Sequence, residues 1–249
     1  MCGPWGRFLG QDVMQQLQST RIGTGPGRLF LHRGTRADLG VIHQMFESQD
    51  YSFERLRRGP ELHALYKDMA STRRQPLILD AGANIGASVV YFHLAFRAAH
   101  IVALEPARSN FEVLRQNMTG IQVDARCEAI GAVTGEAQLI DPGEGEWGYR
   151  TVSALGGERV RVVSASELVS QKIGQGYEPF IAKIDIEGGE ADLFSSNTDW
   201  VDQFPVLIVE LHDWLLTRSA NSRNFLKCIA ALNRDFVYIG ENIFSIKNG

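Results

Sequence analysis

The sequence predicts an α/β fold built on a doubly wound, mostly parallel sheet. Aliphatic segments at 77–79, 100–104 and 180–184 have the length and composition of buried strands, and each is followed by a carboxylate. Apolar residues at helical spacing follow the first two segments. A terminal β-hairpin at 236–246 adds an antiparallel strand. Ligands of open α/β sheets bind at the carboxyl ends of strands, so the carboxylates there mark the candidate site.

A glycine turn follows the first strand, with the pattern Asp80-x-Gly82-x-Asn84-x-Gly86. Glycine admits a ligand close to the backbone, and the helix that follows offers unpaired N–H groups. A dinucleotide fingerprint has glycine where Asn84 stands, so no pyrophosphate is predicted. Asp80 suits a ligand with a cationic centre, such as S-adenosylmethionine, better than one with phosphates. We therefore expect Asp80, Gly82, Ala83, Asn84 and Gly86 to bind this cofactor.

The next two strand ends complete the predicted cofactor site. The strand at 100–104 ends at Glu105 and Pro106, where a carboxylate can accept hydrogen bonds from both ribose hydroxyls. The helix at 109–118 then leads to a strand near 121–123 and a loop at 127–131. In that loop Glu128, beside Ala129, is a candidate acceptor for the adenine amine, with a solvated loop carboxylate as the alternative.

Composition narrows the class of protein. The 249 residues fit one large α/β domain at 61–249 with an N-terminal extension at 1–60. A net charge of −4 without a long basic run argues against nucleic acid as a partner. Three scattered cysteines indicate neither a disulfide framework nor a zinc ribbon. No apolar leader or membrane-length segment is present in the sequence, so we expect a soluble, cytoplasmic protein without a membrane partner.

The extension predicts a loosely held beginning up to residue 27, a strand-like segment at 28–32 and two helices. Asp38 is the expected N-cap of the first helix, and the second begins near Pro60. Tyr51, in the loop between them, either closes over the substrate pocket or packs against the sheet. A homodimer through these helices is left open.

Residues 134–164 interrupt the α/β alternation with strand-like segments around a glycine-rich loop. The loop carries Trp147 and Tyr149. We expect it to be either a flap that contacts the substrate or an ordinary surface loop.

The later strands end in the candidate catalytic residues. Asp185 and Glu187 follow the strand at 180–184, and strand alternation would place them on one face, where repulsion raises at least one pKa. Glu190 is explained by a favourable charge in the first turn of a helix. Glu210 and His212 follow the strand at 206–209, two residues apart. A histidine beside a carboxylate at a strand end is a candidate base.

These motifs together resemble the FkbM family of S-adenosylmethionine-dependent methyltransferases. The resemblance lies in residues 79–86, 105–106, 129–130, 183–190 and 209–212, and residues 35–38 with Tyr51 are similar to the lead-in of many members. It implies a class I methyltransferase (Rossmann-like) sheet of seven strands, the last antiparallel. It also implies O-methylation of hydroxyls on sugars, polyketides or other secondary metabolites.

The mechanism expected is a direct displacement, with the acceptor oxygen about 3–3.5 Å from the methyl carbon. An alcohol needs a base to remove its proton, and the candidates are His212, Asp185 and Glu210, with Glu187 on the substrate side. Asp185 is alternatively a ligand of the cofactor's methionine end. Because acidic pockets also bind amines and water, we assign no metal. The alternative is Mg²⁺, Mn²⁺ or Ca²⁺ held by Asp185, Glu187, Glu210 or His212 so as to orient a diol.

Two other classes of protein stay open from the sequence. An NAD-dependent oxidoreductase would use the same sheet and Glu105, but it would have glycine in place of Asn84. A non-catalytic module would bind the cofactor without turnover. Binding of S-adenosylhomocysteine, with NAD as the control ligand, separates the methyltransferase from the oxidoreductase.

Overall fold

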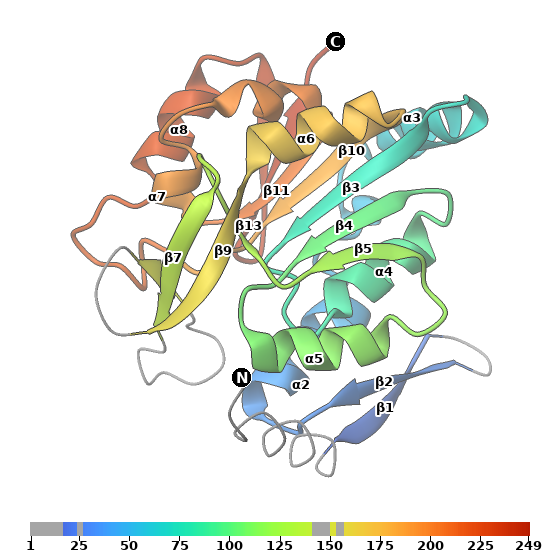
Figure 1. Cartoon of the computed structure of the whole chain (residues 1–249). Coiled ribbons are helices and arrows are strands. Elements are labelled where there is room, and N and C mark those ends of the chain that lie inside the picture. The colour runs from blue at the N-terminus through green and yellow to red at the C-terminus, as the bar shows by residue number, and fades with distance from the viewer. Residues whose placement is uncertain (1–16, 24–26, 141–149, 153–156) are drawn as a thin grey trace.

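The computed structural model describes residues 17–23, 27–140, 150–152 and 157–249. Its centre is a seven-stranded sheet with helices on both faces (Figure 1). From edge to edge, its strands are β12 (Arg234–Ile239), β13 (Asn242–Lys247), β11 (Val206–Glu210), β10 (Tyr177–Ile184), β3 (Gln75–Ala81), β4 (His100–Leu104) and β5 (Val123–Arg126). β13 runs opposite to the other six strands of this sheet, and its pairings with β11 and β12 are antiparallel. The expected doubly wound sheet with a terminal antiparallel hairpin is confirmed.

The strand order reverses between β3 and β10. The chain winds from β3 outward to β4 and β5, and then returns to β10 and β11 on the other side of β3. A crevice opens at such a switch point, at the carboxyl ends of the two strands, because the connections leave in opposite directions. The predicted motifs at 80–86 and 185–190 follow these two strands.

Each face of the sheet has its own apolar core, because both faces of the central strands are buried. Ile78 of β3 packs in one core, and its neighbours Leu77 and Leu79 pack in the other. The first core is covered by α3 (Gly59–Ser71), α4 (Ala87–Ala95) and α5 (Arg108–Asn117). The second is covered by α6 (Ala165–Gly174), α7 (Glu190–Leu193), the 3-10 turn η3 (Thr198–Gln203) and α8 (Arg223–Ala230).

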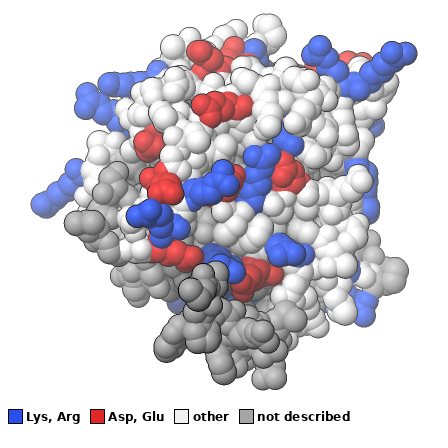
Figure 2. All heavy atoms as spheres, viewed as in Figure 1, with Lys and Arg blue, Asp and Glu red and all other residues white. Residues whose placement is uncertain are grey.

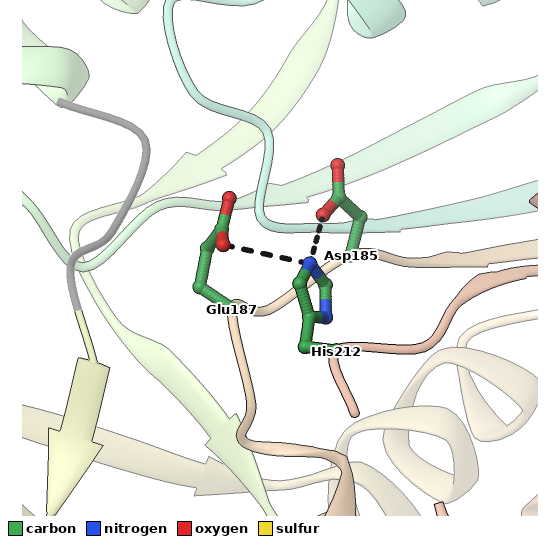
Figure 3. Close-up of side chains that lie close together, drawn as sticks. All are labelled: Asp185, Glu187 and His212. Atoms are coloured by element: carbon green, nitrogen blue, oxygen red, sulfur yellow. Dashed lines mark ion pairs between the residues drawn. The ribbon is translucent and has the colours of Figure 1, made fainter. Parts of the chain in front are cut away.

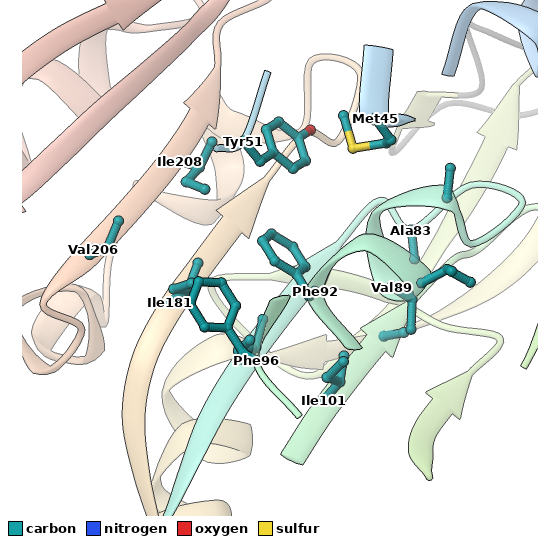
Figure 4. Close-up of a cluster of buried hydrophobic side chains, with 14 of the residues drawn as sticks. Met45, Tyr51, Ala83, Val89, Phe92, Phe96, Ile101, Ile181, Val206 and Ile208 are labelled. Carbon is teal, nitrogen blue, oxygen red and sulfur yellow. The ribbon is translucent and has the colours of Figure 1, made fainter. Parts of the chain in front are cut away.

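The segment before α3 packs into the first of these cores. It consists of the antiparallel pair β1 (Gln18–Ile22) and β2 (Arg28–His32), α2 (Arg36–Ile42), the π-helical turn η1 (His43–Glu47) and the 3-10 turn η2 (Phe53–Arg55). Figure 4 shows Met45 and Tyr51 beside side chains of α4, β10 and β11. A boundary after residue 60 therefore falls inside α3, and the extension shares a core with the sheet.

Two expectations for this segment were wrong. β1 forms within the stretch expected to be loosely held, because β2 pairs with it. The N-cap of α2 is Thr35, whose hydroxyl accepts from the Asp38 backbone N–H. Asp38 is instead buried, and its carboxylate accepts from the backbone N–H and the guanidinium of Arg33 at 2.6 Å each.

Residues between β5 and α6 form a second sheet beside the first (Figure 1). Its order is β6 (Ala129–Gly131), β9 (Glu158–Ser164), β7 (Gly135–Ile140) and β8 (Arg150–Val152). This confirms the strand-like segments within 134–164 where the structure describes them, at 135–140, 150–152 and 158–164. Trp147 and Tyr149 lie outside the described residues, so the flap and their contact with substrate stay predictions.

The surface in Figure 2 has basic and acidic side chains interspersed, in keeping with a net charge of −4. Among the described residues, no helix combines the length and apolar character that crossing a membrane requires.

Candidate functional site

Two pockets open at the carboxyl edge of the central sheet. The narrow pocket runs past Glu105 and Pro106 to the loop at 128–130. The wide cleft, of about 1080 Å³, runs towards α2, Tyr51 and Trp214. Gly82, Asn84, Asp185 and Glu187 line both, so the pockets meet at the switch point between β3 and β10.

The glycine turn is required by the close approach of the neighbouring loop. Gly82 has φ +77°, and a Cβ there would lie 1.7 Å from the carbonyl oxygen of Asp185. Gly86, at φ +89°, begins α4, and a Cβ there would lie 2.8 Å from Met118 Cε. Asn84 has φ +48°, a conformation that asparagine tolerates better than most residues. The glycines predicted to lie beside a ligand are therefore also required by the turn itself.

Glu105 is buried and held by backbone donors. Its two carboxylate oxygens accept from the N–H groups of Asn84 and Ala107, at 2.9 Å each. Burial raises the pKa of Glu105 to about 7, although these hydrogen bonds oppose the rise. The carboxylate lines the narrow pocket, where an ionised form can accept from ligand hydroxyls.

Asp80 lies beneath the turn and lines neither pocket. It is fully buried, accepts from Ser88 Oγ at 2.6 Å and faces Lys183 Nζ at 3.4 Å. Lys183 also donates to the carbonyl of Gly82 at 2.6 Å and lies 3.4 Å from Asp185. Burial disfavours its charged form, but Asp185, Tyr51 and Asp80 outweigh that and raise the pKa of Lys183. Asp80 therefore supports the turn through Lys183, a residue to which the sequence assigned no role, and its direct contact with the cofactor stays a prediction.

Asp185, Glu187 and His212 point toward one another from the ends of two neighbouring strands (Figure 3). Nε2 of His212 lies 3.6 Å from Asp185 Oδ1, 3.4 Å from Glu187 Oε2 and 3.6 Å from Glu210 Oε1. The predicted convergence is present, but its reason was wrong. β10 ends at Ile184, and Glu187 has φ +51°, so a turn rather than strand alternation brings the two carboxylates together.

The charges of this cluster shift its protonation. Burial and the neighbouring Asp185 raise the pKa of Glu187 and of Glu210 to about 8. Burial alone would lower the pKa of His212, but the hydrogen bond to Glu190 and the charges of Glu190, Asp185 and Glu187 raise it to about 9. His212 is also 1% exposed and lines neither pocket. This placement favours a positioning role for His212 over that of a base in contact with substrate.

Glu190 and Asn221 complete the cluster, and the sequence argument missed both roles. Glu190 is fully buried, and its Oε1 lies 2.8 Å from His212 Nδ1. Asn221 Nδ2 donates to the other oxygen at 2.6 Å. The explanation of Glu190 as a favourable charge in a helical turn was therefore incomplete, because tertiary contacts hold it. No sequence signal marked Asn221.

The remaining predicted residues border the two pockets. Glu128 and Ala129 line the narrow pocket, and Tyr51 lines the wide cleft while its ring stacks on Phe92 at 5.7 Å. Tyr51 therefore packs in the core, and its contact with a substrate stays a prediction. Trp214, which the sequence argument passed over, lines the wide cleft and is 64% exposed.

Comparison with known proteins gives a match to a methyltransferase family. Residues 80–238 match the family model of the methyltransferase FkbM domain. The hexuronic acid methyltransferase AglP of Haloferax volcanii is 25% identical over 166 residues, which cover 64% of this chain and 67% of AglP.

Two solved structures are similar at lower identity. The O-methyltransferase of Bacillus cereus in complex with S-adenosylhomocysteine is 12% identical, with a TM-score of 0.43 over 84% of this chain and 91% of that chain. Human methyltransferase-like protein 13, also in complex with S-adenosylhomocysteine, is 13% identical, with a TM-score of 0.43 over 79% and 82% of the two chains.

Proposed function

Because the chain belongs to the FkbM family of methyltransferases and uses S-adenosylmethionine, we propose that it methylates a hydroxyl group of an acidic sugar. The observation that carries this proposal is the meeting of a narrow pocket and a wide cleft at Gly82, Asn84, Asp185 and Glu187. A methyl donor in one and an acceptor in the other would react at that junction. The family match favours methyl transfer over the hydride transfer considered from the sequence.

The narrow pocket suits the cofactor, which supplies an activated methyl group. Glu105 would accept from the ribose hydroxyls, and Glu128 from the adenine amine. Asn84 provides a direct sign of fit, because its Oδ1 is buried and has no hydrogen-bond partner among the described residues. A buried acceptor without a partner costs free energy, which the ammonium group of a bound ligand would recover.

The wide cleft suits a sugar that carries a carboxylate. Trp214 exposes an aromatic face on which an apolar sugar face can pack. Arg36 is exposed at the same cleft and has no hydrogen bond or ion pair within the described ranges. Arginine binds carboxylates with two parallel hydrogen bonds. The relative AglP is described as a hexuronic acid methyltransferase, which supports the same class of acceptor.

Glu210 is the residue we assign to remove the proton from the acceptor hydroxyl. It lines the wide cleft but not the narrow pocket, so it lies on the acceptor's side of the junction. The carboxylate would take the proton as the hydroxyl oxygen forms its bond to the methyl carbon, and the cofactor would supply that methyl group with its sulfur as the leaving group. Holding the two reactants in line supplies much of the acceleration.

The test is transfer of labelled methyl from S-adenosylmethionine to uronic acid glycosides, with neutral glycosides as matched acceptors. We expect labelled uronic acid products in which the methyl survives mild alkali, because a methyl ether resists hydrolysis and a methyl ester does not. Alkali-labile products would mean that the carboxylate is the acceptor. Equal transfer to neutral glycosides would remove the acidic specificity, and absence of transfer to any glycoside would contradict the proposal.

Two variants separate the proposed roles within the wide cleft. Glu210→Gln is expected to lower kcat by about 10²–10⁴-fold while S-adenosylhomocysteine binds as before. Trp214→Ala is expected to raise the acceptor KM with a smaller effect on kcat, because it removes binding surface rather than the base. An unchanged kcat in Glu210→Gln would assign the proton transfer to another group.

A further inference from the structure

Asp185, Glu187 and His212 surround a gap between the ends of β10 and β11 (Figure 3). One atom of each side chain, a carboxylate oxygen or Nε2, lies within 4.8 Å of the corresponding atoms of the other two. Asp185 and Glu187 line both pockets, so the gap borders the place where cofactor and acceptor would meet.

The imidazole of His212 is fixed with Nε2 toward this gap. Nδ1 of His212 lies 2.8 Å from Oε1 of Glu190, within hydrogen-bond distance, so the other ring nitrogen is left facing the gap. Glu190 is itself fully buried and accepts from Asn221. A histidine that binds a metal through one ring nitrogen characteristically donates its other N–H to a carboxylate in this way.

The distances around Nε2 are those of metal ligands rather than hydrogen-bonded groups. Asp185 and Glu187 lie 3.6 and 3.4 Å from Nε2, beyond the 2.7–3.2 Å of a hydrogen bond. Nε2 has no hydrogen bond to any described residue, although the side chain is only 1% exposed. Around a cation with ligands at about 2.1 Å, neighbouring ligand atoms are separated by about 3.0–3.5 Å. The two separations from Nε2 are close to this spacing, and the oxygens of Asp185 and Glu187 lie within 4.8 Å of each other.

Carboxylates also outnumber basic side chains in the cluster. The carboxylates of Asp185, Glu187 and Glu210 all lie within 3.6 Å of Nε2, and Glu190 lies behind the ring. Lys183 faces Asp185, but its other contacts are with Asp80 and the carbonyls of Ala81 and Gly82. A cation in the gap would lie close to several carboxylates at once, and their charges would attract it.

The geometry points to a binding site for one divalent cation, held by Nε2 of His212 and by carboxylate oxygens of Asp185 and Glu187. The two carboxylates suit a hard ion such as Mn²⁺, and the imidazole is a donor that also suits Zn²⁺ and Fe²⁺. Mn²⁺ is the probe of this site. Three protein ligands leave further coordination positions for water or acceptor oxygens. This inference goes beyond the proposed function, since cation binding does not require methyl transfer.

The test is titration of the full chain, stripped of metal and without cofactor, with MnCl₂, following the electron paramagnetic resonance signal of free Mn²⁺. We expect saturation at one Mn²⁺ per chain. Glu187→Gln is expected to weaken binding at least tenfold, and Glu190→Gln, through the orientation of His212, by about 10–100-fold. Glu54→Gln is the matched control, because it makes the same charge change on a side chain that is 83% exposed and lines neither pocket.

The side chain of Glu187 is 26% exposed, so we expect Glu187→Gln to fold. Thermal unfolding in metal-free buffer checks the folding of each variant. Asp185→Asn provides a second ligand variant, which is also expected to weaken binding at least tenfold. Absence of saturable binding to the wild-type chain would overturn the inference. Equal affinity in Glu187→Gln, Asp185→Asn and the control would overturn it too. Neither result depends on whether a sugar is methylated.

Discussion

Glu105 and the cluster of Asp185, Glu187 and His212 lie at the same edge of the sheet, but they are held differently. Each oxygen of Glu105 accepts from a backbone N–H at 2.9 Å, whereas Nε2 of His212 faces carboxylates at 3.4 and 3.6 Å. Backbone donors are fixed by the fold, so Glu105 is satisfied before any ligand arrives. The cluster instead places several carboxylates around Nε2 at 3.4–3.6 Å, which suits it to a charged or reacting ligand.

The glycine turn, whose Asn84 N–H donates to Glu105, is connected to the cluster by Lys183 and Gly82. Lys183 bridges Asp80 under the glycine turn and Asp185 in the cluster, and Gly82 lets the backbone of the loop after β10 approach the turn. Substitutions at these positions therefore test whether the two regions form one unit.

The largest effect is expected for Lys183→Met, which leaves Asp80 and Asp185 without their buried cation. Loss of one partner from a buried ion pair costs about 3–5 kcal/mol of the free energy of unfolding, measured with urea. Lys172→Met is the matched control: Lys172 is also buried and pairs with Asp124, but Arg126 still pairs with Asp124 in its absence. Equal losses of unfolding free energy in both variants would show that the ion pairs of Lys183 stabilise the fold no more than those of Lys172.

The raised pKa of Glu105 should make the free energy of unfolding depend on pH. Its pKa is about 7 in the folded chain and about 4.5 when unfolded, so the folded state binds the proton more tightly. Its stabilising contribution is present below pH 4.5 and is lost as pH rises through 7. The side chain of Glu105→Gln cannot ionise, so the variant does not lose this contribution as pH rises. Between pH 4.5 and 8 the free energy of unfolding of the wild type should therefore fall, relative to that of the variant, by up to about 3 kcal/mol. Urea titrations over this range measure it, and a constant difference would contradict the shift.

Gly82→Ala is expected to destabilise the chain by about 2 kcal/mol or more and to weaken binding of S-adenosylhomocysteine. The added Cβ would meet the Asp185 carbonyl oxygen at 1.7 Å and would sit at φ +77°. Gly135→Ala, where a Cβ meets nothing within 4 Å, should change stability by less than about 0.5 kcal/mol. If the two alanine variants behave alike, the close approach of the two loops does not constrain the turn.

Ligand binding at Glu105 should show the smallest of these effects. At pH 8, Glu105→Gln is expected to bind S-adenosylhomocysteine about tenfold more weakly, because a neutral amide replaces a charge-assisted acceptor. The wild-type affinity should rise from pH 6 to pH 8 as the carboxylate ionises, and that of the variant should not. Calorimetric titration at both pH values measures this, and parallel profiles would exclude Glu105 as the ribose acceptor.

Much of the site could be predicted because its residues follow strands that are readable by themselves. Glu105 and Asp185 come directly after aliphatic strands, and parallel strands bring their carboxyl ends to one edge. The N-cap of α2 was harder to predict, because Thr35 and Asp38 are both residue types that cap helices. The hydrogen bonds from Arg33 to Asp38, which leave Thr35 as the cap, are visible only in the structure. Trp214 carried no signal, since its exposure on the cleft depends on the path of the loop after β11.

By itself, the sequence determined the α/β class, the reversed terminal strand, the glycine turn and the acidic strand ends. These follow from local patterns of apolar spacing, glycine and charge, which act over a few residues. Only the tertiary structure decided that Asp80 lies below the pocket, that Glu190 and Asn221 orient His212, and that the two pockets meet at Asp185 and Glu187. Burial and distance between segments remote in the chain depend on how the strands pair, and no local pattern encodes them.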